Sequence, residues 1–204
     1  MNAKTYSLQE QAQIAKERLM NHGVVAFPTE TVMGLGVLFN DKEAYEKLNR
    51  IKRRPEDKPY TLMVKNKEEI YKYGCVNERI ERVIDKFIPG SLTILIPLKD
   101  GSVPEYVTHG THILGIRVPE NKESLAVLEA VNQPLLVPSA NRSGEAPALT
   151  SDEVKNIFGN EIDFVVDGSA QKSQPSTIID LTGETPKVVR KGPISEEEIL
   201  KVWR

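Results

Sequence analysis

The sequence has almost no cysteine. Cys75 is the only cysteine in the 204-residue chain, which excludes an intramolecular disulfide and a metal site built from several thiolates. A chain without disulfides is compatible with a reducing compartment. His109 and His112 lie in a predicted loop, and we predict no metal site at them or elsewhere.

Long apolar segments are also missing. No apolar stretch approaches the ~20 residues that a transmembrane helix needs. Residues 1–19 are polar and amphipathic, and they lack the apolar region of a secretory signal peptide. These absences lead us to expect a cytoplasmic protein.

Neither sign of charge dominates the chain. The 27 lysines and arginines nearly balance 29 acidic residues, which gives a net charge of −2 and a pI near 6.0. This balance provides no global attraction to nucleic acid or to a membrane, although a local basic site remains compatible with it. Because no repeat, low-complexity tract or linker interrupts the sequence, we expect a single domain over residues 1–204.

Helical and strand patterns alternate along the chain, which predicts an α/β protein. The spacing of apolar residues predicts helices at 8–22, 42–51, 67–73, 80–87, 124–131, 152–158 and 196–203. Short apolar runs predict strands at 24–27, 37–39, 60–64, 92–98, 111–119, 134–137, 164–168, 176–181 and 187–192. Ser7, Asp41 and Ser195 are suited to cap three of the helices, and Ser195 has Glu198 at the position of a capping box. Residues 103–107 are too short to assign as a strand.

A polar turn follows the first predicted strand. Pro28 ends the strand because it cannot donate to a sheet, and Thr29, Glu30 and Thr31 follow at once. Two glycines, at positions 34 and 36, then suggest a backbone that approaches another group closely. The alternative is a strand followed by a capped helix or a tight turn, with Thr29 or Thr31 as the cap.

A cluster of positive charge follows the second predicted helix. Five cationic side chains lie between residues 50 and 58, and Pro55 and Pro59 prevent a continuous helix there. Prolines on both sides would hold Arg54 and Lys58 on a constrained loop. A guanidinium and an ammonium together suit a polyphosphate, whereas the alternative is an ordinary solvated surface.

Two further segments point to anion binding. Arg117 stands between Ile116 and Val118 in a predicted buried strand, where a charge needs a partner. That partner is either a structural carboxylate or the carboxylate of a substrate. Residues 138–144 (PSANRSG) form a second turn rich in hydroxyl and amide groups after a strand, which is typical of an anion-binding nest or of a plain helix-capping turn.

Taken together, six linked motifs resemble the YrdC-like family of L-threonylcarbamoyladenylate synthases. The resemblance runs from about residue 10 to the C-terminus. It implies an α/β fold with a twisted mixed β-sheet flanked by helices around a large, concave, basic cavity. The motifs are FPTETVMGLG (27–36), Lys52-Arg53-Arg54 with Lys58-Pro59, PGSLTIL (89–95), GIRVP (115–119), PSANRSG (138–144), and STIIDL (176–181) with Arg190 after it.

The resemblance also implies an activity. Proteins of this family convert L-threonine, bicarbonate and ATP, assisted by Mg²⁺, to threonylcarbamoyl-AMP and pyrophosphate. This nucleotidyl transfer is the first step of threonylcarbamoyl-adenosine modification in tRNA. The product is expected to pass to a downstream threonylcarbamoyl transferase complex.

Position by position, the resemblance implies three overlapping groups of site residues. The catalytic group is Lys52, Arg54, Ser139 and Asn141. The ATP-binding group is Arg54, Lys58, Ile113 (through its main chain), Asn141 and Arg190. The threonine-binding group is Thr31, Met63, Arg117, Ser139 and Ser176.

The sequence departs from the family pattern in the amino-acid pocket and in length. Met33 occupies a position that is more often aromatic, and Met63 a position where some members have histidine. The chain also resembles the short form of the family, without an extra C-terminal domain. Two alternative functions remain open: a double-stranded RNA or tRNA-binding module, and a domain that handles carbamoyl phosphate. Relatives of the second kind have zinc-finger cysteines, and this chain has one cysteine.

Overall fold

The computed structural model describes residues 5–53 and 58–204, and it contains one mixed sheet of nine strands. The strand order is β7-β1-β2-β6-β3-β5-β4-β8-β9, with parallel pairs β1–β7, β3–β5 and β4–β8 and antiparallel pairs elsewhere. The strands are β1 (Val25–Phe27), β2 (Gly34–Leu38), β3 (Leu62–Met63), β4 (Leu92–Pro97), β5 (Ile113–Arg117), β6 (Leu135–Leu136), β7 (Phe164–Val165), β8 (Thr177–Asp180) and β9 (Lys187–Arg190).

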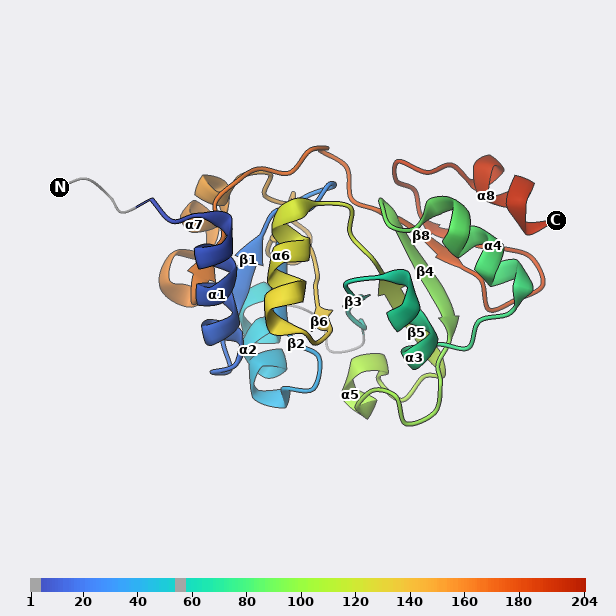
Figure 1. Ribbon diagram of the computed structural model, residues 1–204, viewed down its shortest axis with the longest axis horizontal. Coiled ribbons are helices and arrows are strands. Elements are labelled where there is room, and N and C mark those ends of the chain that lie inside the picture. The colour runs from blue at the N-terminus through green and yellow to red at the C-terminus, as the bar shows by residue number, and fades with distance from the viewer. Residues whose placement is uncertain (1–4, 54–57) are drawn as a thin grey trace.

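Helices alternate with the strands, as the sequence pattern predicts, and they pack on the sheet (Figure 1). They are α1 (Leu8–Leu19), α2 (Lys42–Lys52), α3 (Ile70–Tyr73), α4 (Glu78–Phe87), α5 (Glu105–Thr108), α6 (Lys122–Val131), α7 (Ser151–Phe158) and α8 (Glu196–Trp203), with 3₁₀ turns at Lys67–Glu69 and Gly159–Glu161. The predicted caps Ser7, Asp41 and Ser195 are confirmed, because each side chain accepts a hydrogen bond from its first helical turn. None of the described helices is long and apolar enough to cross a bilayer.

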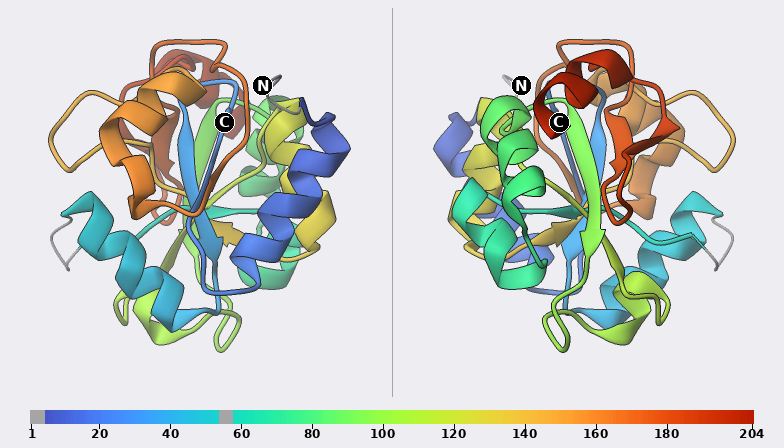
Figure 2. Two further views of the ribbon diagram at one scale, coloured as in Figure 1. Left: turned by 90° about the vertical axis from the view of Figure 1, so that its left-hand side faces the viewer. Right: turned by 90° about the vertical axis from the view of Figure 1, so that its right-hand side faces the viewer.

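Helices cover both faces of the sheet, so most strands are buried. Figure 2 shows α1 and α6 on one face and α2 and α7 on the other. α1 packs directly against α6, and α4 against α8. The layer beneath α1 and α6 is apolar and includes Leu19, Phe27, Met63, Val127 and Leu135.

The polar turn after β1 leads into a strand, not into a helix. Thr29 Oγ1 accepts from the backbone N–H groups of Thr31 and Val32, which closes the turn, and β2 begins at Gly34. A Cβ on Gly36 would lie 2.7 Å from the ring of Phe27. The close approach that these glycines allow is therefore to neighbouring side chains of the sheet. Residues 103–107, which the sequence left unassigned, contain the start of α5.

The connection between β7 and β8 crosses the molecule. β7 lies at one edge of the sheet and β8 next to the other edge, so the connection runs over the ends of the strands (orange, top of Figure 1). Backbone hydrogen bonds of Gly168 to Ser151, the first residue of α7, and of Ala170 to Leu149 hold its first part. Its last residues, Pro175 and Ser176, reach the start of β4, where the predicted site residues gather.

Candidate functional site

A cavity of about 140 Å³ lies at one end of the sheet. It is smaller than the ~300–1,000 Å³ pockets of drug-sized ligands, so its enclosed part suits an amino-acid-sized group. The described lining contains two arginines and no carboxylate. The lining residues are Thr31, Val32, Pro59, Tyr60, Thr61, Thr93, Arg117, Val137, Pro138, Ser139, Pro175, Ser176, Ile178 and Arg190.

Adjacent strands of the sheet supply one wall of this cavity. Ile94 pairs with Ile116, which places Thr93 of β4 beside Arg117 of β5. On the other side Thr93 pairs with Ile178 of β8, and Ile178 pairs with Arg190 of β9. Paired residues of neighbouring strands point to the same face of a sheet. The wall therefore has an arginine at each end and a hydroxyl between them.

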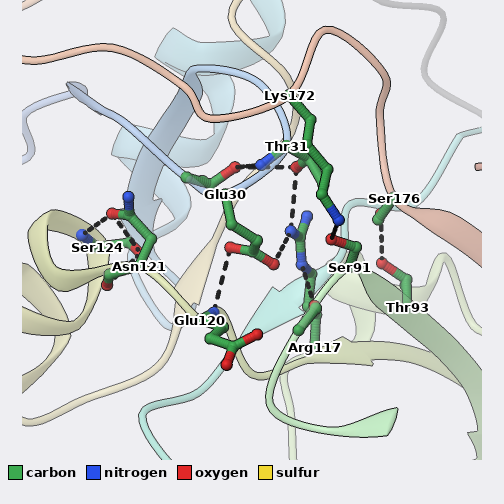
Figure 3. Close-up of polar contacts among 12 residues, drawn as sticks. Glu30, Thr31, Ser91, Thr93, Arg117, Glu120, Asn121, Ser124, Lys172 and Ser176 are labelled. Carbon is green, nitrogen blue, oxygen red and sulfur yellow. Dashed lines mark hydrogen bonds and ion pairs between the residues drawn. The ribbon is translucent and has the colours of Figure 1, made fainter. Parts of the chain in front are cut away.

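Arg117 is held by partners on two sides. Its Nη2 donates to Glu30 Oε1 at 2.5 Å and to Thr31 Oγ1 at 3.0 Å, and its Nε donates to the carbonyl oxygen of Gly90 at 3.2 Å (Figure 3). Glu30 is almost fully buried, and its Oε2 accepts from the backbone N–H of Glu120. Among the described residues, Nη1 of Arg117 has no hydrogen-bond partner. That nitrogen is available to a ligand in the cavity, which Arg117 lines.

Arg190 is the second cation of the cavity, and it forms no ion pair with any described residue. Its Nε and Nη2 donate to the carbonyl oxygen of Ser176, and Nη2 also donates to Ser176 Oγ at 3.0 Å. Burial, and then the positive charge of Arg117, lower the pKa of Arg190 from its usual value. Two guanidinium groups that repel each other, with one buried carboxylate beside them, leave an excess of positive charge. An anionic ligand would balance it.

The turn after β6 brings Ser139 into the cavity, and Lys52 supports that turn from behind. The buried Lys52 Nζ donates to the carbonyl oxygens of Ser139 (2.6 Å) and Asn141 (2.8 Å) and to Asn141 Oδ1 (3.2 Å). Ser139 Oγ donates to the same Oδ1, and Asn141 Nδ2 donates to two further carbonyl oxygens. In this structure Lys52 and Asn141 fix the backbone that carries Ser139, and neither lines the cavity.

Arg142, in the same turn, anchors it to α2 and α7. It forms an ion pair with Glu161 and donates to the carbonyl oxygens of Ile51 and Ile157. Its guanidinium also lies 4.8 Å from the ring centre of Phe158. The hydrogen bond from Arg142 lowers the pKa of Glu161. Lys52 and Arg142 therefore hold residues 139–142 of the motif PSANRSG in place.

The structure brings together some of the predicted site residues and separates others. Thr31, Arg117, Ser139, Ser176 and Arg190 line one cavity. Arg54, to which both a catalytic and an ATP-binding role were assigned, lies outside the described residues. The remaining predicted residues do not line the cavity.

Besides Asn141, three predicted ligand contacts, Met63, Ile113 and Lys58, lie outside the cavity lining. Met63 is buried in the apolar layer beneath α1 and α6, and Met33 is buried in the other apolar cluster. Ile113 is partly exposed and begins β5, at the opposite end of that strand from Arg117. Lys58 is exposed and precedes Pro59, which does line the cavity.

Sequence reasoning missed two residues of the site. Glu30 was seen only as one polar residue of a turn, although the buried Arg117 required a partner. Thr93 lies in a strand pattern of mostly apolar residues, which does not show which face the hydroxyl takes. For Thr93 the available signal was a single hydroxyl within an apolar strand. For Glu30 the available signal was the positive charge predicted in a buried strand at Arg117, which required a partner.

The described residues contain no group of three or more His, Cys, Asp or Glu side chains that could hold a metal ion. Glu30, whose carboxylate contacts the lining residue Arg117, is engaged by Arg117 and by a backbone N–H.

Comparison with known proteins identifies the family. The family model named Sua5_yciO_yrdC, with the description "Telomere recombination", matches residues 17–192. The chain belongs to the Sua5/YciO/YrdC family. This match includes the turn after β1, both cavity arginines and the PSANRSG turn.

Members of the Sua5/YciO/YrdC family at similar identity have different names. The chain is 34% identical over 181 residues to the threonylcarbamoyl-AMP synthase of Pyrococcus abyssi, covering 88% of this chain and 53% of that protein. It is 31% identical over 179 residues to the uncharacterised protein YciO of Escherichia coli, covering 87% of each. Identity alone therefore does not decide the activity of a family member.

The fold is shared with a solved family member. The crystal structure of P. abyssi Sua5 complexed with L-threonine matches with a TM-score of 0.90 at 31% identity, over 98% of this chain and 58% of that chain. The chain thus spans somewhat more than half the length of Sua5. The YrdC-like mixed α/β fold predicted from the sequence is confirmed.

Proposed function

We propose that this chain is a threonylcarbamoyl-AMP synthase, a nucleotidyltransferase that converts L-threonine, bicarbonate and ATP to threonylcarbamoyl-AMP and pyrophosphate. The observation that carries the proposal is the cavity in which Thr31, Arg117, Ser139, Ser176 and Arg190 meet. Two arginines, with one buried counter-carboxylate among the described residues, suit a small molecule that carries negative charge. The family membership supports the same substrate, because a relative from P. abyssi is named for this reaction and a solved P. abyssi family structure contains L-threonine.

In this proposal Arg117 binds the carboxylate of threonine. Arg117 lines the cavity, and Glu30, Thr31 and Gly90 hold its Nε and Nη2, so the guanidinium is oriented before the ligand arrives. Ser139 and Ser176 add hydroxyl groups to the lining of the cavity. Fixing the amino acid in this way presents its amine to bicarbonate.

The chemical step then needs cations and positioning more than a protein nucleophile. A carbamate oxygen of carboxylated threonine attacks the α-phosphorus of ATP, and the bond from that phosphorus to the bridging oxygen breaks as pyrophosphate leaves. Negative charge builds up on the phosphates, which arginine and lysine side chains stabilise. Arg190, Lys58 and Arg54 are the proposed groups, and Mg²⁺ enters as part of the ATP complex. Lys52 and Asn141 act by holding Ser139 in place.

The direct test is mass-spectrometric detection of threonylcarbamoyl-AMP after incubation with ATP, threonine and bicarbonate. Pyrophosphate release should require threonine, and Arg54→Ala should abolish it. Thermal unfolding offers an independent comparison, because a ligand that binds the folded state raises the melting temperature. A rise in melting temperature with ATP and threonine would support the synthase proposal. A rise with carbamoyl phosphate alone would instead indicate an activity on carbamoyl phosphate.

The proposed product also implies a partner. An acyl adenylate of this type is a reactive mixed anhydride, so the next reaction must transfer its threonylcarbamoyl group to an acceptor. We propose tRNA adenosine as that acceptor, through a separate transferase. Incubating the product mixture with such a transferase and tRNA, and digesting the tRNA to nucleosides, tests this step.

A further inference from the structure

The geometry points to Thr93 as a substrate-binding residue, whose hydroxyl donates a hydrogen bond to the carboxylated amine of the amino acid in the cavity. This inference rests on the proposed function and deepens it, because it assigns a group to the bicarbonate-derived part of the ligand. Neither the sequence motifs nor the family resemblance had assigned a role to Thr93.

Thr93 occupies the middle of the cavity wall formed by the sheet. It is 2% exposed and lies between Arg117 on β5 and, across Ile178, Arg190 on β9. Neighbouring strands are about 4.8 Å apart, so the Cα atoms of the two arginines are roughly 14 Å apart, and both long side chains reach the cavity between them. A ligand that bridges the two cations must pass over Thr93.

The hydrogen bonds of the wall leave one hydroxyl proton available, and we assign it to Thr93. Thr93 Oγ1 and Ser176 Oγ are 3.0 Å apart (Figure 3). Ser176 Oγ also accepts from Arg190 Nη2. Each hydroxyl has one proton and two lone pairs, so one of the two protons is used between the hydroxyls and the other remains for the cavity. When Ser176 donates to Thr93, the series runs from Arg190 through Ser176 to Thr93. The charged donor at its start strengthens the last hydrogen bond.

One available O–H group between two guanidinium groups suits an anion with two negative ends. The carboxylated amino acid has such a form, with a carboxylate at one end and a carbamate at the other. Because Arg117 takes the carboxylate in the proposed function, the carbamate lies nearer the middle of the wall. Thr93 then contributes to binding only after carboxylation, and the free amino acid binds without it.

The test uses a substitution that removes the hydroxyl and keeps the shape. Thr93→Val replaces the O–H group with a methyl group, and Ser176 keeps its hydrogen bond from Arg190. We expect kcat/KM for bicarbonate, from threonine-dependent pyrophosphate release, to fall about 10- to 100-fold, as for the loss of one hydrogen bond to a charged group. Threonine affinity without bicarbonate, measured by calorimetry, should stay within about threefold of wild type. Thr93→Ser, which restores the hydroxyl, should restore kcat/KM.

Thr177→Val is the matched control. Thr177 is on β8 beside Ser176, but its side chain points to the opposite face and exchanges hydrogen bonds with the backbone of Ile194. This variant should unfold at a lower temperature and keep the wild-type kinetic constants. It thus separates loss of a buried hydrogen bond from loss of a substrate contact.

The outcomes distinguish this inference from the function on which it rests. If wild type releases pyrophosphate and Thr93→Val keeps kcat/KM for bicarbonate within about twofold, the Thr93 assignment is wrong and the proposed function stands. A fall in threonine affinity as large as the fall in kcat/KM would also overturn it, because Thr93 would then contact the free amino acid or support the fold. A wild-type protein without turnover overturns the proposed function, and the assignment of the carbamate with it.

Discussion

Arg117 shows how one buried charge serves both the fold and the site. Glu30 comes from the turn after β1 and Arg117 from β5, and their side chains are 4% and 8% exposed. The pair is worth little as a net stabilising contribution, because both charges lose hydration when they are buried. Breaking the pair is different, since it leaves one charge buried without a partner. Glu30 therefore disfavours any arrangement in which Arg117 is displaced, because the displacement would leave a buried charge unpaired.

A double-mutant cycle tests this pairing at the residue scale. Arg117→Met should lower the free energy of unfolding by about 3–5 kcal/mol, because Glu30 stays buried without its partner. Adding Glu30→Gln should recover part of that loss, so the two effects should be far from additive in urea denaturation. The exposed pair Lys201–Glu197 is the control, and its coupling should be near zero. Additive effects at Glu30 and Arg117 would refute the pairing.

Lys52 provides a second residue-scale prediction. Lys52→Met removes the donor to the carbonyl oxygens of Ser139 and Asn141, and the free energy of unfolding should fall by about 1–3 kcal/mol. Because Ser139 is then less well placed, pyrophosphate release should fall as well. Lys155→Met, at a half-exposed lysine on α7, should change stability by less than about 0.5 kcal/mol. Equal effects of the two substitutions on activity would exclude a supporting role for Lys52.

At the scale of elements, the pairing of β1 with β2 depends on a missing side chain. The ring of Phe27 covers Gly36 diagonally across the two strands, and a Cβ on Gly36 would lie 2.7 Å from it. Gly36→Ala should therefore destabilise the protein by about 1–3 kcal/mol through overpacking. Gly183→Ala, where the nearest atom is 3.8 Å away, should be nearly neutral. Thermal or urea unfolding of both variants tests this prediction. If Gly36→Ala were as stable as Gly183→Ala, β2 would have moved to accept the methyl group.

The helix α5 gives a prediction about pH. Tyr106 donates from its hydroxyl to the carbonyl oxygen of Phe39, and burial, with the charge of Asp41, raises the pKa of Tyr106 to about 12. An unfolded tyrosine ionises near pH ~10. The folded protein thus keeps this proton above pH ~10 while the unfolded chain loses it, so the stability it contributes is complete below pH ~10 and declines as the pH rises towards about 12.

Absorbance titration of phenolate formation checks this value. Tyr71 and Tyr73 also have raised pKa values, so the assignment needs the difference between wild type and Tyr106→Phe. The step lost in the variant should lie near pH 12. A lost step near the ordinary tyrosine value would show that α5 opens before Tyr106 ionises.

At the scale of the whole molecule, charge balance argues against RNA binding as the main function. The formal charge is −2, and non-specific binding to nucleic acid depends on neutralised phosphates. We expect a gel shift with generic double-stranded RNA to need more than about 10 µM protein at ~0.15 M salt, with a shallow salt dependence. A tight complex that weakens steeply with salt would instead support the RNA-binding alternative.

Most helices and strands of the fold were predicted from local sequence patterns. The helices capped by Ser7, Asp41 and Ser195 were predicted because a cap and its first turn are neighbours in sequence. Most strands were predicted from short apolar runs, whereas β2 begins earlier than expected because Gly34 and Gly36 have no apolar side chain to reveal it. The order of the strands was not readable, since hydrogen bonds between strands join residues far apart along the chain.

The site was predicted in part through family motifs. Five of the predicted residues meet in one cavity, but the motifs do not show that Lys52 and Asn141 point into the turn that carries Ser139. They also do not reveal Glu30 as the partner of Arg117, 87 residues away. Those facts depend on side-chain direction and on contacts between distant segments.

The sequence by itself determined the α/β class, the helix ends, the family and the residue types that a site for an anionic ligand requires. These follow from periodicity, caps and short motifs, all of which act within a few residues. Only the tertiary structure decided that Thr93 lies between the two arginines and that Glu30 neutralises one of them. The physical reason is that sheet pairing places residues from separate segments on one face. A charge buried among them is then stable only with a partner or a ligand.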